Sequence, residues 1–405
     1  MKNLPVSLVI FISVLILNSC ASNCDKSVYY YAKVPVYGSL ESLRKGVEVT
    51  DVQSMDTITK IVELNHAYFL EEKGKGIHVI DKVSFNEPRL VSFIRIPGFL
   101  SAEAINNTLF IGQATDLFSI NVSDLNSIQV SSRVKNVLNA GFVKSDSFIV
   151  GYTEAYIRLV LEDAKCAETY IYPENSSEFL SLSVEPHINL HITNNHVHAC
   201  DNNNVSSFSI NNDDLLFRAS SPIGTGRNTT SPTISSTPEF LAVGTPTSNI
   251  FLFQNDGSLN RVVSTFVSSP FTCGKFSLFQ NTAIYTDFET NPAQGCGSQN
   301  SMHIHPINGL SQPFIPRQFS FTQPQYTSIV DSTLLLCDGS AGFSLFDFKN
   351  PSMFNPDTDK FDALTNVHAA VGVLSTERAL VWGNDGLFYF DVKTPSNIQL
   401  ITEIK

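Results

Sequence analysis

Short stretches in which apolar and polar residues alternate recur along the chain, and two of them are nearly identical. Residues 342–351 read GFSLFDFKNP, and residues 386–395 read GLFYFDVKTP. Each begins with glycine, continues with alternating apolar side chains, and ends in Lys and Pro separated by one polar residue. This order is typical of a β-strand that leads into a turn. The pattern therefore predicts a strand that is used repeatedly.

Weaker copies of this strand occur along most of the chain. They span residues 76–82, 116–123, 155–162, 204–211, 249–256 and 301–308. With the two clear copies they make eight, and their starting residues are separated by about 39 to 52 residues, the period of a four-stranded propeller blade. In the first of these units the apolar pattern predicts four strands, at residues 57–65, 67–72, 77–83 and 89–96.

The predicted strands carry large apolar side chains on both faces. In one of them Phe343 and Leu345 point to one side, whereas Phe346 and Phe348 point to the other. A sheet that is apolar on both faces must be covered on both faces, and blades that pack face to face around an axis satisfy this requirement. The fold class is therefore predicted as all-β, a β-propeller of eight four-stranded blades. Seven blades is the alternative, if the first or last copy only completes another blade.

The ends of the chain complete the predicted domain organisation, which is a signal peptide at 1–19, a tether and lead-in segment at 20–56, and a single propeller at 57–405. Within the lead-in, residues 29–37 are predicted to form an edge strand. This strand is predicted to pair with a neighbouring blade and so to close the ring. Residues 39–47 read as a short helix capped by Ser39 or Ser42, with Gly46 near its end. Residues 398–404 read as the outer strand of the last blade.

Composition and charge restrict the partners of this propeller. The 405 residues include 30 Phe and 12 Tyr, only 16% are charged, and the formal net charge is −12. Nucleic-acid binding depends on clustered Lys and Arg that neutralise phosphates. No nucleic acid is therefore predicted as a partner.

The amino terminus has the features of an export signal. Lys2 precedes an apolar run at residues 8–17, which is short for a membrane span and has the length of a signal-peptide core. The run ends in Leu17-Asn18-Ser19-Cys20, which resembles the lipobox of bacterial lipoproteins and implies a lipid on Cys20. An ordinary signal peptide with a chance cysteine is the alternative. Because no Asp follows the Cys at the second position, an outer-membrane lipoprotein, periplasmic or surface-exposed, is predicted.

Several segments together resemble the LVIVD-repeat lipoproteins of Bacteroidota. They are VPVY at 34–37, EEKGKGIHVID at 71–81, RVKNV at 133–137, CDGSAG at 337–342, and the strand at 386–395. The resemblance implies a propeller-like, lipid-anchored cell-surface or periplasmic protein, and it implies no catalytic residues. The chain departs from the family pattern at Gln325, where members often have His. It also departs from it in the middle repeats, which lack the Asp-Pro turn motif.

Six cysteines remain if Cys20 is lipidated, and one pair is predicted to form a disulfide. Cys273 precedes the first strand of its unit and Cys296 follows the second. These two kinds of loop emerge on the same face of a propeller, and paired cysteines at these places also resemble the family. Cys200 and Cys337 lie near the ends of second strands and are interpreted as buried thiols.

The histidine pattern is compatible with two roles. His196, His198 and Cys200 alternate along one strand with His191 nearby, and His303 and His305 have the same spacing. Side chains on one face of a strand are able to ligate a metal, but histidines in such positions more often pack between blades. The prediction is packing, with no metal and no cofactor.

A candidate ligand face follows from the propeller architecture. The loops between second and third strands lie at one end of the ring, around its central channel, and they gather much of the charge in a chain that has little elsewhere. Solvated turn residues are the alternative role. The candidates are Glu72, Lys73, Lys75, Asp287, Glu289, Asp338, Ser340, Asn384 and Asp385.

Two functions are compatible with this sequence. The favoured hypothesis is a non-enzymatic interaction or ligand-binding module for an envelope protein or glycan, because no catalytic constellation is present. The alternative is a glycan-active lyase or hydrolase that draws its acid and base from Asp287, Asp338 and Asp385.

Overall fold

The structure is a computed structural model, and it divides the chain into two compact units. One unit comprises residues 1–37 and 151–184, and the other comprises residues 38–150 and 185–405. The described residues are 26–82, 87–125, 127–138, 147–161, 188–193, 195–201, 203–211, 214–223, 233–245, 249–266, 276–288, 300–307 and 317–404.

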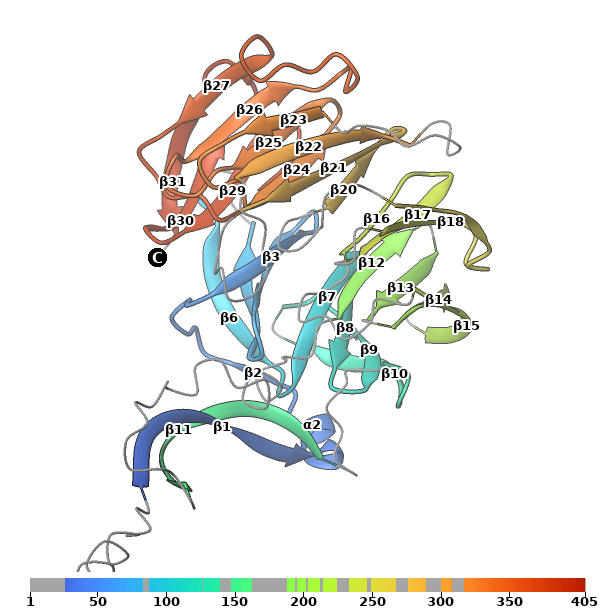
Figure 1. Cartoon of the computed structure of the whole chain (residues 1–405), viewed down its shortest axis with the longest axis vertical. Helices are drawn as coiled ribbons and strands as arrows, with labels where there is room; N and C mark the ends of the chain where they lie inside the picture. The colour runs from blue at the N-terminus through green and yellow to red at the C-terminus, as the bar shows by residue number, and fades with distance from the viewer. Residues whose placement is uncertain are drawn as a thin grey trace, which may run out of the picture. The chain divides into compact units, whose positions relative to one another are not determined.

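The larger unit is a β-propeller of seven blades, each an antiparallel meander of four consecutive strands (Figure 1). The all-β propeller prediction is therefore confirmed. Blades 1 to 4 contain β3(Ile58–Glu63), β4(Ala67–Glu72), β5(Gly76–Asp81), β6(Arg89–Arg95); β7(Phe99–Ile105), β8(Thr108–Gln113), β9(Asp116–Asn121), β10(Gln129–Val134); β12(Asn189–Thr193), β13(His196–Cys200), β14(Asn204–Asn211), β15(Asp214–Pro222); and β16(Thr233–Ser236), β17(Phe240–Thr245), β18(Asn249–Gln254), β19(Arg261–Phe266).

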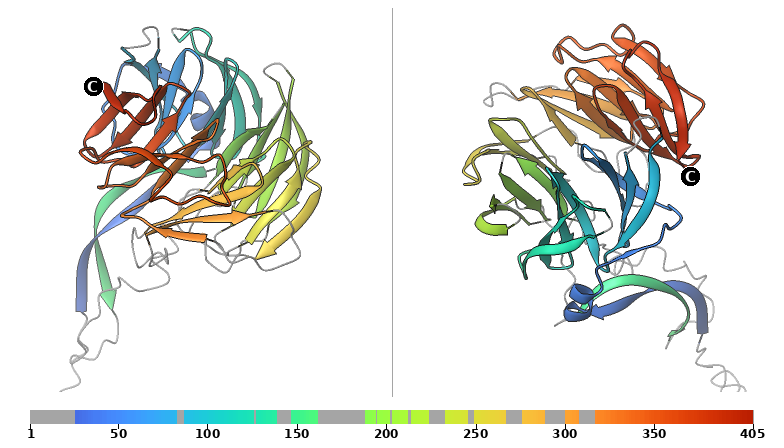
Figure 2. Two further views of the ribbon diagram at one scale, coloured as in Figure 1. Left: turned by 90° about the horizontal axis from the view of Figure 1, so that it is seen from above. Right: turned by 180° about the vertical axis from the view of Figure 1, so that it is seen from behind.

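The remaining three blades follow the same plan. They contain β20(Phe276–Phe279), β21(Thr282–Asp287), β22(Ser301–Pro306), β23(Arg317–Ser320); β24(Tyr326–Val330), β25(Thr333–Cys337), β26(Phe343–Asp347), β27(Lys360–Leu364); and β28(Val371–Leu374), β29(Arg378–Gly383), β30(Gly386–Asp391), β31(Gln399–Ile404). The strand colours run from blue through green and yellow to red around the ring in Figure 2. The four strands predicted for the first unit and the outer strand predicted at the carboxyl terminus are confirmed.

The prediction of eight blades is wrong, and the seven-bladed alternative is confirmed for a different reason from the one expected. The copy at residues 155–162 is the one that forms no blade. Its described part lies in β11(Ser147–Leu161), which pairs with β1(Lys26–Ser39) in a two-stranded sheet. Alternation of side chains predicts that a segment is a strand, but the choice of its partner depends on contacts distant in sequence.

The ring closes by packing of blade 7 on blade 1, since every blade is built from one continuous stretch of chain. Buried residues of both blades form one cluster that includes Leu70 and Leu380, and the rings of Tyr68 and Tyr389 meet edge to face at 6.1 Å between centroids. The prediction that residues 29–37 close the ring is wrong, because they lie in β1, whose partner strand is β11 and not a strand of a blade. A different lead-in strand, β2(Glu48–Thr50), adds to the outer edge of blade 1 beside β6.

The predicted lead-in helix is confirmed as α2(Leu40–Lys45), and Ser39 is its cap. The Ser39 hydroxyl accepts a hydrogen bond from the backbone N–H of Ser42, and Gly46 follows the last turn. Arg44 then binds the Asp116 carboxylate at 2.7 Å and 3.0 Å through two nitrogens. Burial works to raise the pKa of Asp116, but hydrogen bonds from Arg44, Asn136 and Arg133 lower it overall. The helix is thus fastened to blade 2.

Among the described residues no helix has the length and apolar character needed to cross a membrane.

Candidate functional site: the central channel

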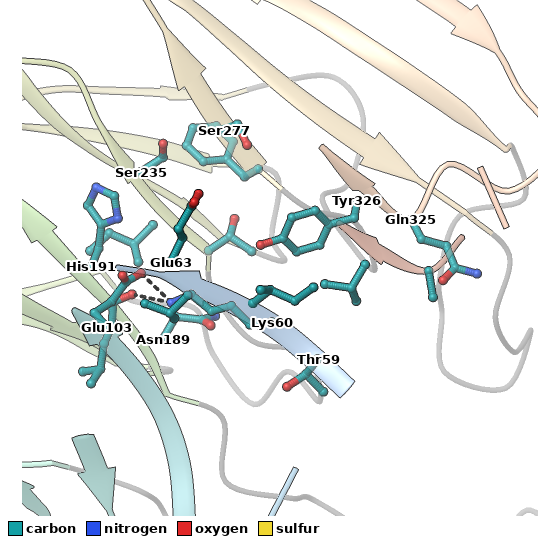
Figure 3. A pocket seen from close by; sticks show the side chains of 18 of the residues that line it. Thr59, Lys60, Glu63, Glu103, Asn189, His191, Ser235, Ser277, Gln325 and Tyr326 are labelled. Atoms are coloured by element: carbon teal, nitrogen blue, oxygen red, sulfur yellow. Dashed lines mark hydrogen bonds and ion pairs between the residues drawn. The ribbon is translucent and has the colours of Figure 1, made fainter. Parts of the chain in front are cut away.

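A cavity of about 540 Å³ lies on the axis of the ring, and residues in or next to the first strand of every blade contribute to its wall (Figure 3). This volume falls within the range of roughly 300 to 1,000 Å³ that is usual for small-molecule sites. Its lining residues are Thr59, Lys60, Ile61, Val62, Glu63, Glu103, Ala104, Asn189, Leu190, His191, Thr233, Ile234, Ser235, Phe276, Ser277, Phe288, Gln325, Tyr326, Ala370 and Val371.

Lys60 links three blades inside this channel. From β3 of blade 1 its ammonium donates to the Glu103 carboxylate at 2.5 Å and to the Ala102 carbonyl at 2.9 Å, both in blade 2. It also reaches the carbonyl oxygen of Leu190 in blade 3 at 3.4 Å. The three acceptors match the three protons of an ammonium group. Lys60 is therefore fully engaged by the protein.

The charge of Lys60 is maintained by its surroundings. Burial alone would lower the pKa of this amine, but the carboxylates of Glu103 and Glu71 outweigh burial and raise it overall. Glu71 lies behind the wall, where its Oε1 accepts hydrogen bonds from the Ala102 N–H at 2.6 Å and the Ser101 hydroxyl at 3.2 Å. Lys60 is thus protonated at neutral pH and is not a nucleophile or a general base.

Tyr326 enters the channel from blade 6, with its hydroxyl directed toward the side on which Lys60 and Glu103 lie (Figure 3). Burial raises the pKa of this phenol, and the negative charges of Glu103 and Glu71 raise it further against the opposing effect of Lys60. The hydroxyl therefore stays protonated and is able to act as both donor and acceptor.

The second lining carboxylate, Glu63, is also paired. Lys82 donates to it at 2.7 Å and to the Leu64 carbonyl at 3.1 Å. The Lys82 ammonium lies 4.4 Å from the centre of the Tyr68 ring as well. Among the described residues, each carboxylate that lines the channel is therefore paired with its own lysine.

The polar remainder of the wall consists of hydroxyl and amide groups. Some of them also join neighbouring blades: Ser235 accepts from the Leu278 N–H at 2.9 Å, and the hydroxyl of Ser277 lies 3.2 Å from that of Thr327. His191 contacts the Ser236 hydroxyl at 2.8 Å through Nε2. These groups give the channel a surface with many hydrogen-bonding atoms.

The candidate ligand face does not form part of this wall, since none of its described residues lines the cavity. In blade 1, Glu72 is buried and accepts from Lys75 at 2.6 Å, and its other oxygen lies 2.6 Å from Nε2 of His78. Lys73 is an exposed residue of the same turn. The first turn of this face thus uses its charges to hold its own loop.

The candidates of blades 6 and 7 hold loops in a similar way. Asp338 accepts backbone N–H groups of Gln323 at 2.6 Å and Thr322 at 3.2 Å, although burial still raises its pKa overall. Asp385 accepts the His368 N–H at 2.7 Å. Ser340 and Asn384 are exposed turn residues, and Asp287 is buried at the end of β21. Glu289 lies outside the described residues.

The predicted packing role of the histidines is consistent with their contacts. His198 is buried and lies 2.6 Å from the Thr193 hydroxyl, and His303 stacks on Tyr285 with 4.5 Å between ring centres. Burial lowers the pKa of His198 to about 3 and that of His303 to about 4. Within the described part of the chain no group of three His, Cys, Asp or Glu residues is placed to hold a metal ion.

His198 should make the propeller sensitive to acid. Its pKa is about 3 when folded against an ordinary 6.5, so the unfolded chain binds the proton more readily below pH 6.5. The contribution of His198 to the free energy of unfolding is therefore fully present above pH 6.5. It falls by up to about 1.4 kcal/mol per pH unit as the pH decreases toward 4. Urea unfolding of His198→Gln should show a stability deficit at pH 7 that shrinks by pH 4. A deficit that stays constant across this range would contradict the assignment.

The two cysteines interpreted as buried thiols are confirmed in that state. Cys200 ends β13 and Cys337 ends β25, and both are free and fully buried. Desolvation raises the pKa of both thiols, which makes them poor nucleophiles. Cys20, Cys273 and Cys296 lie outside the described residues, so the lipidation site and the disulfide stay predictions.

The residues that the sequence analysis missed are those of the channel wall, above all Lys60, Glu103 and Tyr326. One signal was available for Lys60, which is a charged residue within the strand predicted at 57–65. Such positions are unusual in strands that are apolar on both faces, and in a propeller they face the axis.

Comparison of the sequence with protein-family models and with curated proteins gives no match. Among solved structures, the chain resembles PorZ of Porphyromonas gingivalis, described as an essential bacterial surface component of the type-IX secretion system. That similarity has a TM-score of 0.50 and 9% identity, and it covers 87% of this chain and 39% of PorZ. The chain also resembles Saccharomyces cerevisiae Sqt1, with a TM-score of 0.50, 9% identity, and coverage of 88% and 87% of the two chains. At these identities the comparisons establish a shared propeller fold and nothing finer.

Proposed function

We propose that this protein is a lipid-anchored propeller of the bacterial cell envelope, related to the LVIVD-repeat lipoproteins, which acts as a non-enzymatic ligand-binding or interaction module. The observation that carries the proposal is the central channel, to which all seven blades contribute and whose charged groups are paired within the protein. Such a site is suited to binding rather than to acid–base chemistry, which needs a group free to exchange its proton.

Two further observations support an envelope role. The sequence at Leu17-Asn18-Ser19-Cys20 has the lipobox pattern, and PorZ, which is described as a bacterial surface component, shares the propeller fold. Because this chain spans only 39% of PorZ, the activity of PorZ is not carried over to it. The proposed location is the outer membrane, facing either the periplasm or the exterior.

The glycan lyase or hydrolase alternative is less well supported by the geometry. Asp338 and Asp385 belong to different blades; Asp338 accepts two backbone N–H groups and Asp385 accepts one, from His368. Carboxylates that act as acid and base in glycoside hydrolysis must face one substrate across a short distance. Their engagement in loops favours structural roles for these two residues.

Lipid attachment is tested by replacing Cys20. Cells that express the full chain are fed an alkyne-tagged fatty acid, and the protein is then fractionated. We expect the wild-type protein to carry the tag and sediment with outer membranes, whereas Cys20→Ala should lose the tag entirely because it removes the only thiol in the lipobox.

The matched control is Cys24→Ala, which removes the next cysteine of the same segment and should keep both the tag and the membrane location. An untagged wild-type protein, or a Cys20→Ala variant that is still tagged, would contradict lipid anchoring. Capture of a stable partner from solubilised outer membranes by the tagged wild-type chain would support the interaction role.

A further inference from the structure

We propose that the central channel binds an uncharged, hydroxyl-rich ligand of the saccharide class. This inference rests on the proposed ligand-binding function and specifies where and what the protein binds. It is carried by three properties of the wall, namely its charge balance, its hydrogen-bonding groups and its aromatic side chains.

The charge balance disfavours ionic ligands. Lys60 and Glu103 pair at 2.5 Å, and Glu63 pairs with Lys82 at 2.7 Å. An anion would have to compete with Glu103 for Lys60, while Glu71 adds a further negative charge behind the wall. A cation would have to displace a lysine from its carboxylate. Breaking a largely buried ion pair leaves one charge uncompensated and is costly. A neutral ligand avoids both costs.

The uncharged hydrogen-bonding groups of the wall are of a kind that sugars match, and several of them also bond to neighbouring residues of the protein. Hydroxyl groups donate and accept, and primary amides offer both functions at fixed positions, as the hydroxyls of a sugar do. They come from blades 1, 3, 4, 5 and 6, so they surround the axis. The groups are Thr59, Asn189, Thr233, Ser235, Ser277, Gln325 and Tyr326.

Aromatic side chains complete the wall. Phe288 and Tyr326 line the channel on the side of blades 5 and 6 and are partly exposed, whereas Phe276 on the same side is only 1% exposed and packs in the core. Aromatic rings pack well against the apolar C–H face of a sugar, whose hydroxyls project outward at its edges. The cavity of about 540 Å³ has room for a short oligosaccharide or the end of a longer glycan.

The test is calorimetric titration of the purified full-length protein with matched trisaccharides. The probes are triacetylchitotriose with its deacetylated, cationic counterpart, and galactotriose with its anionic counterpart trigalacturonate. We expect at least one neutral member to bind with a dissociation constant below about 1 mM, and its charged counterpart to bind at least tenfold more weakly. Equal or tighter binding of the charged member would overturn the proposal, as would no binding of either neutral member.

The place of binding is tested by filling the channel. Ala370 lines the cavity and is partly exposed, so Ala370→Trp should weaken binding of the neutral trisaccharide at least tenfold. Ala363→Trp is the matched control, because Ala363 is partly exposed on β27, the outer strand of blade 6, and it should leave binding unchanged. Ala104→Trp fills the channel from blade 2 and replaces the first variant if that variant does not fold.

The outcomes separate this inference from the proposed function. Unchanged binding in a folded channel-filling variant would place the site elsewhere and overturn the inference. The fatty-acid labelling and partner capture do not depend on the channel, so an anchored protein that binds no saccharide would leave the envelope role in place while rejecting the ligand class.

Discussion

Replacing Lys60 with Met should destabilise the propeller by about 2 to 4 kcal/mol. The substitution keeps most of the side-chain volume but leaves the Glu103 carboxylate and the Ala102 carbonyl without their partner. Removing one member of a buried ion pair costs about 3 to 5 kcal/mol, and we expect a lower value because the channel admits water. Urea unfolding at pH 7 measures the change.

Two further variants test whether the loss of the Lys60–Glu103 ion pair causes this destabilisation. Lys393 pairs with Glu377 at 3.5 Å on the surface, where the two side chains are 69% and 40% exposed. Lys393→Met should therefore cost less than about 1 kcal/mol. Adding Glu103→Gln to Lys60→Met should recover part of the lost stability, because the side chain at position 103 then no longer carries a charge that has lost its partner. Equal effects of the two lysine variants, or no recovery in the double variant, would refute the proposed link between blades.

Replacing Gly342 with Ala should destabilise the protein by about 2 to 5 kcal/mol. Gly342 has a φ of +85°, and a Cβ atom would lie 1.8 Å from the backbone oxygen of Leu364. A side chain in the left-handed region costs about 1 to 2 kcal/mol, and forced overlap in a packed region adds about 1 to 3 kcal/mol. Since β27 supplies the clashing oxygen, blade 6 would have to separate its third and fourth strands.

Gly386 provides the matched control, because it begins the other nearly identical stretch. Its φ is +132°, but a Cβ atom there would meet nothing closer than 3.7 Å. Gly386→Ala should therefore lower the free energy of unfolding only by the cost of placing a side chain at positive φ, about 1 to 2 kcal/mol. Thermal and urea unfolding of both variants give the comparison. A larger loss for Gly386→Ala than for Gly342→Ala would show that steric overlap does not decide the difference.

Local structure could be predicted from the sequence where local interactions determine it. The lead-in helix was identified from Ser39, Gly46 and the residues between them, since a cap and a stop signal lie within one short segment. The strands of the first blade were located nearly residue for residue, because alternation and turn residues act over a few positions.

The candidate site was predicted less well, for a physical reason. Charged turn residues such as Glu72 and Asp338 stand out in the sequence, but their described contacts hold their own loops. The channel wall instead combines a few residues from or next to the first strand of every blade. No local pattern shows that Lys60 meets the carbonyl oxygen of Leu190, 130 positions later in the chain.

The sequence by itself determined that this chain is a β-propeller, because side chains that are apolar on both faces of every repeated sheet require neighbouring sheets to cover them. Only the tertiary structure decided that there are seven blades, that β11 pairs with β1 and belongs to no blade, and that a channel whose lining carboxylates are each paired with a lysine lies on the axis. The pattern of a strand sets which faces must be buried, whereas its partner and the groups it meets across the ring depend on long-range packing.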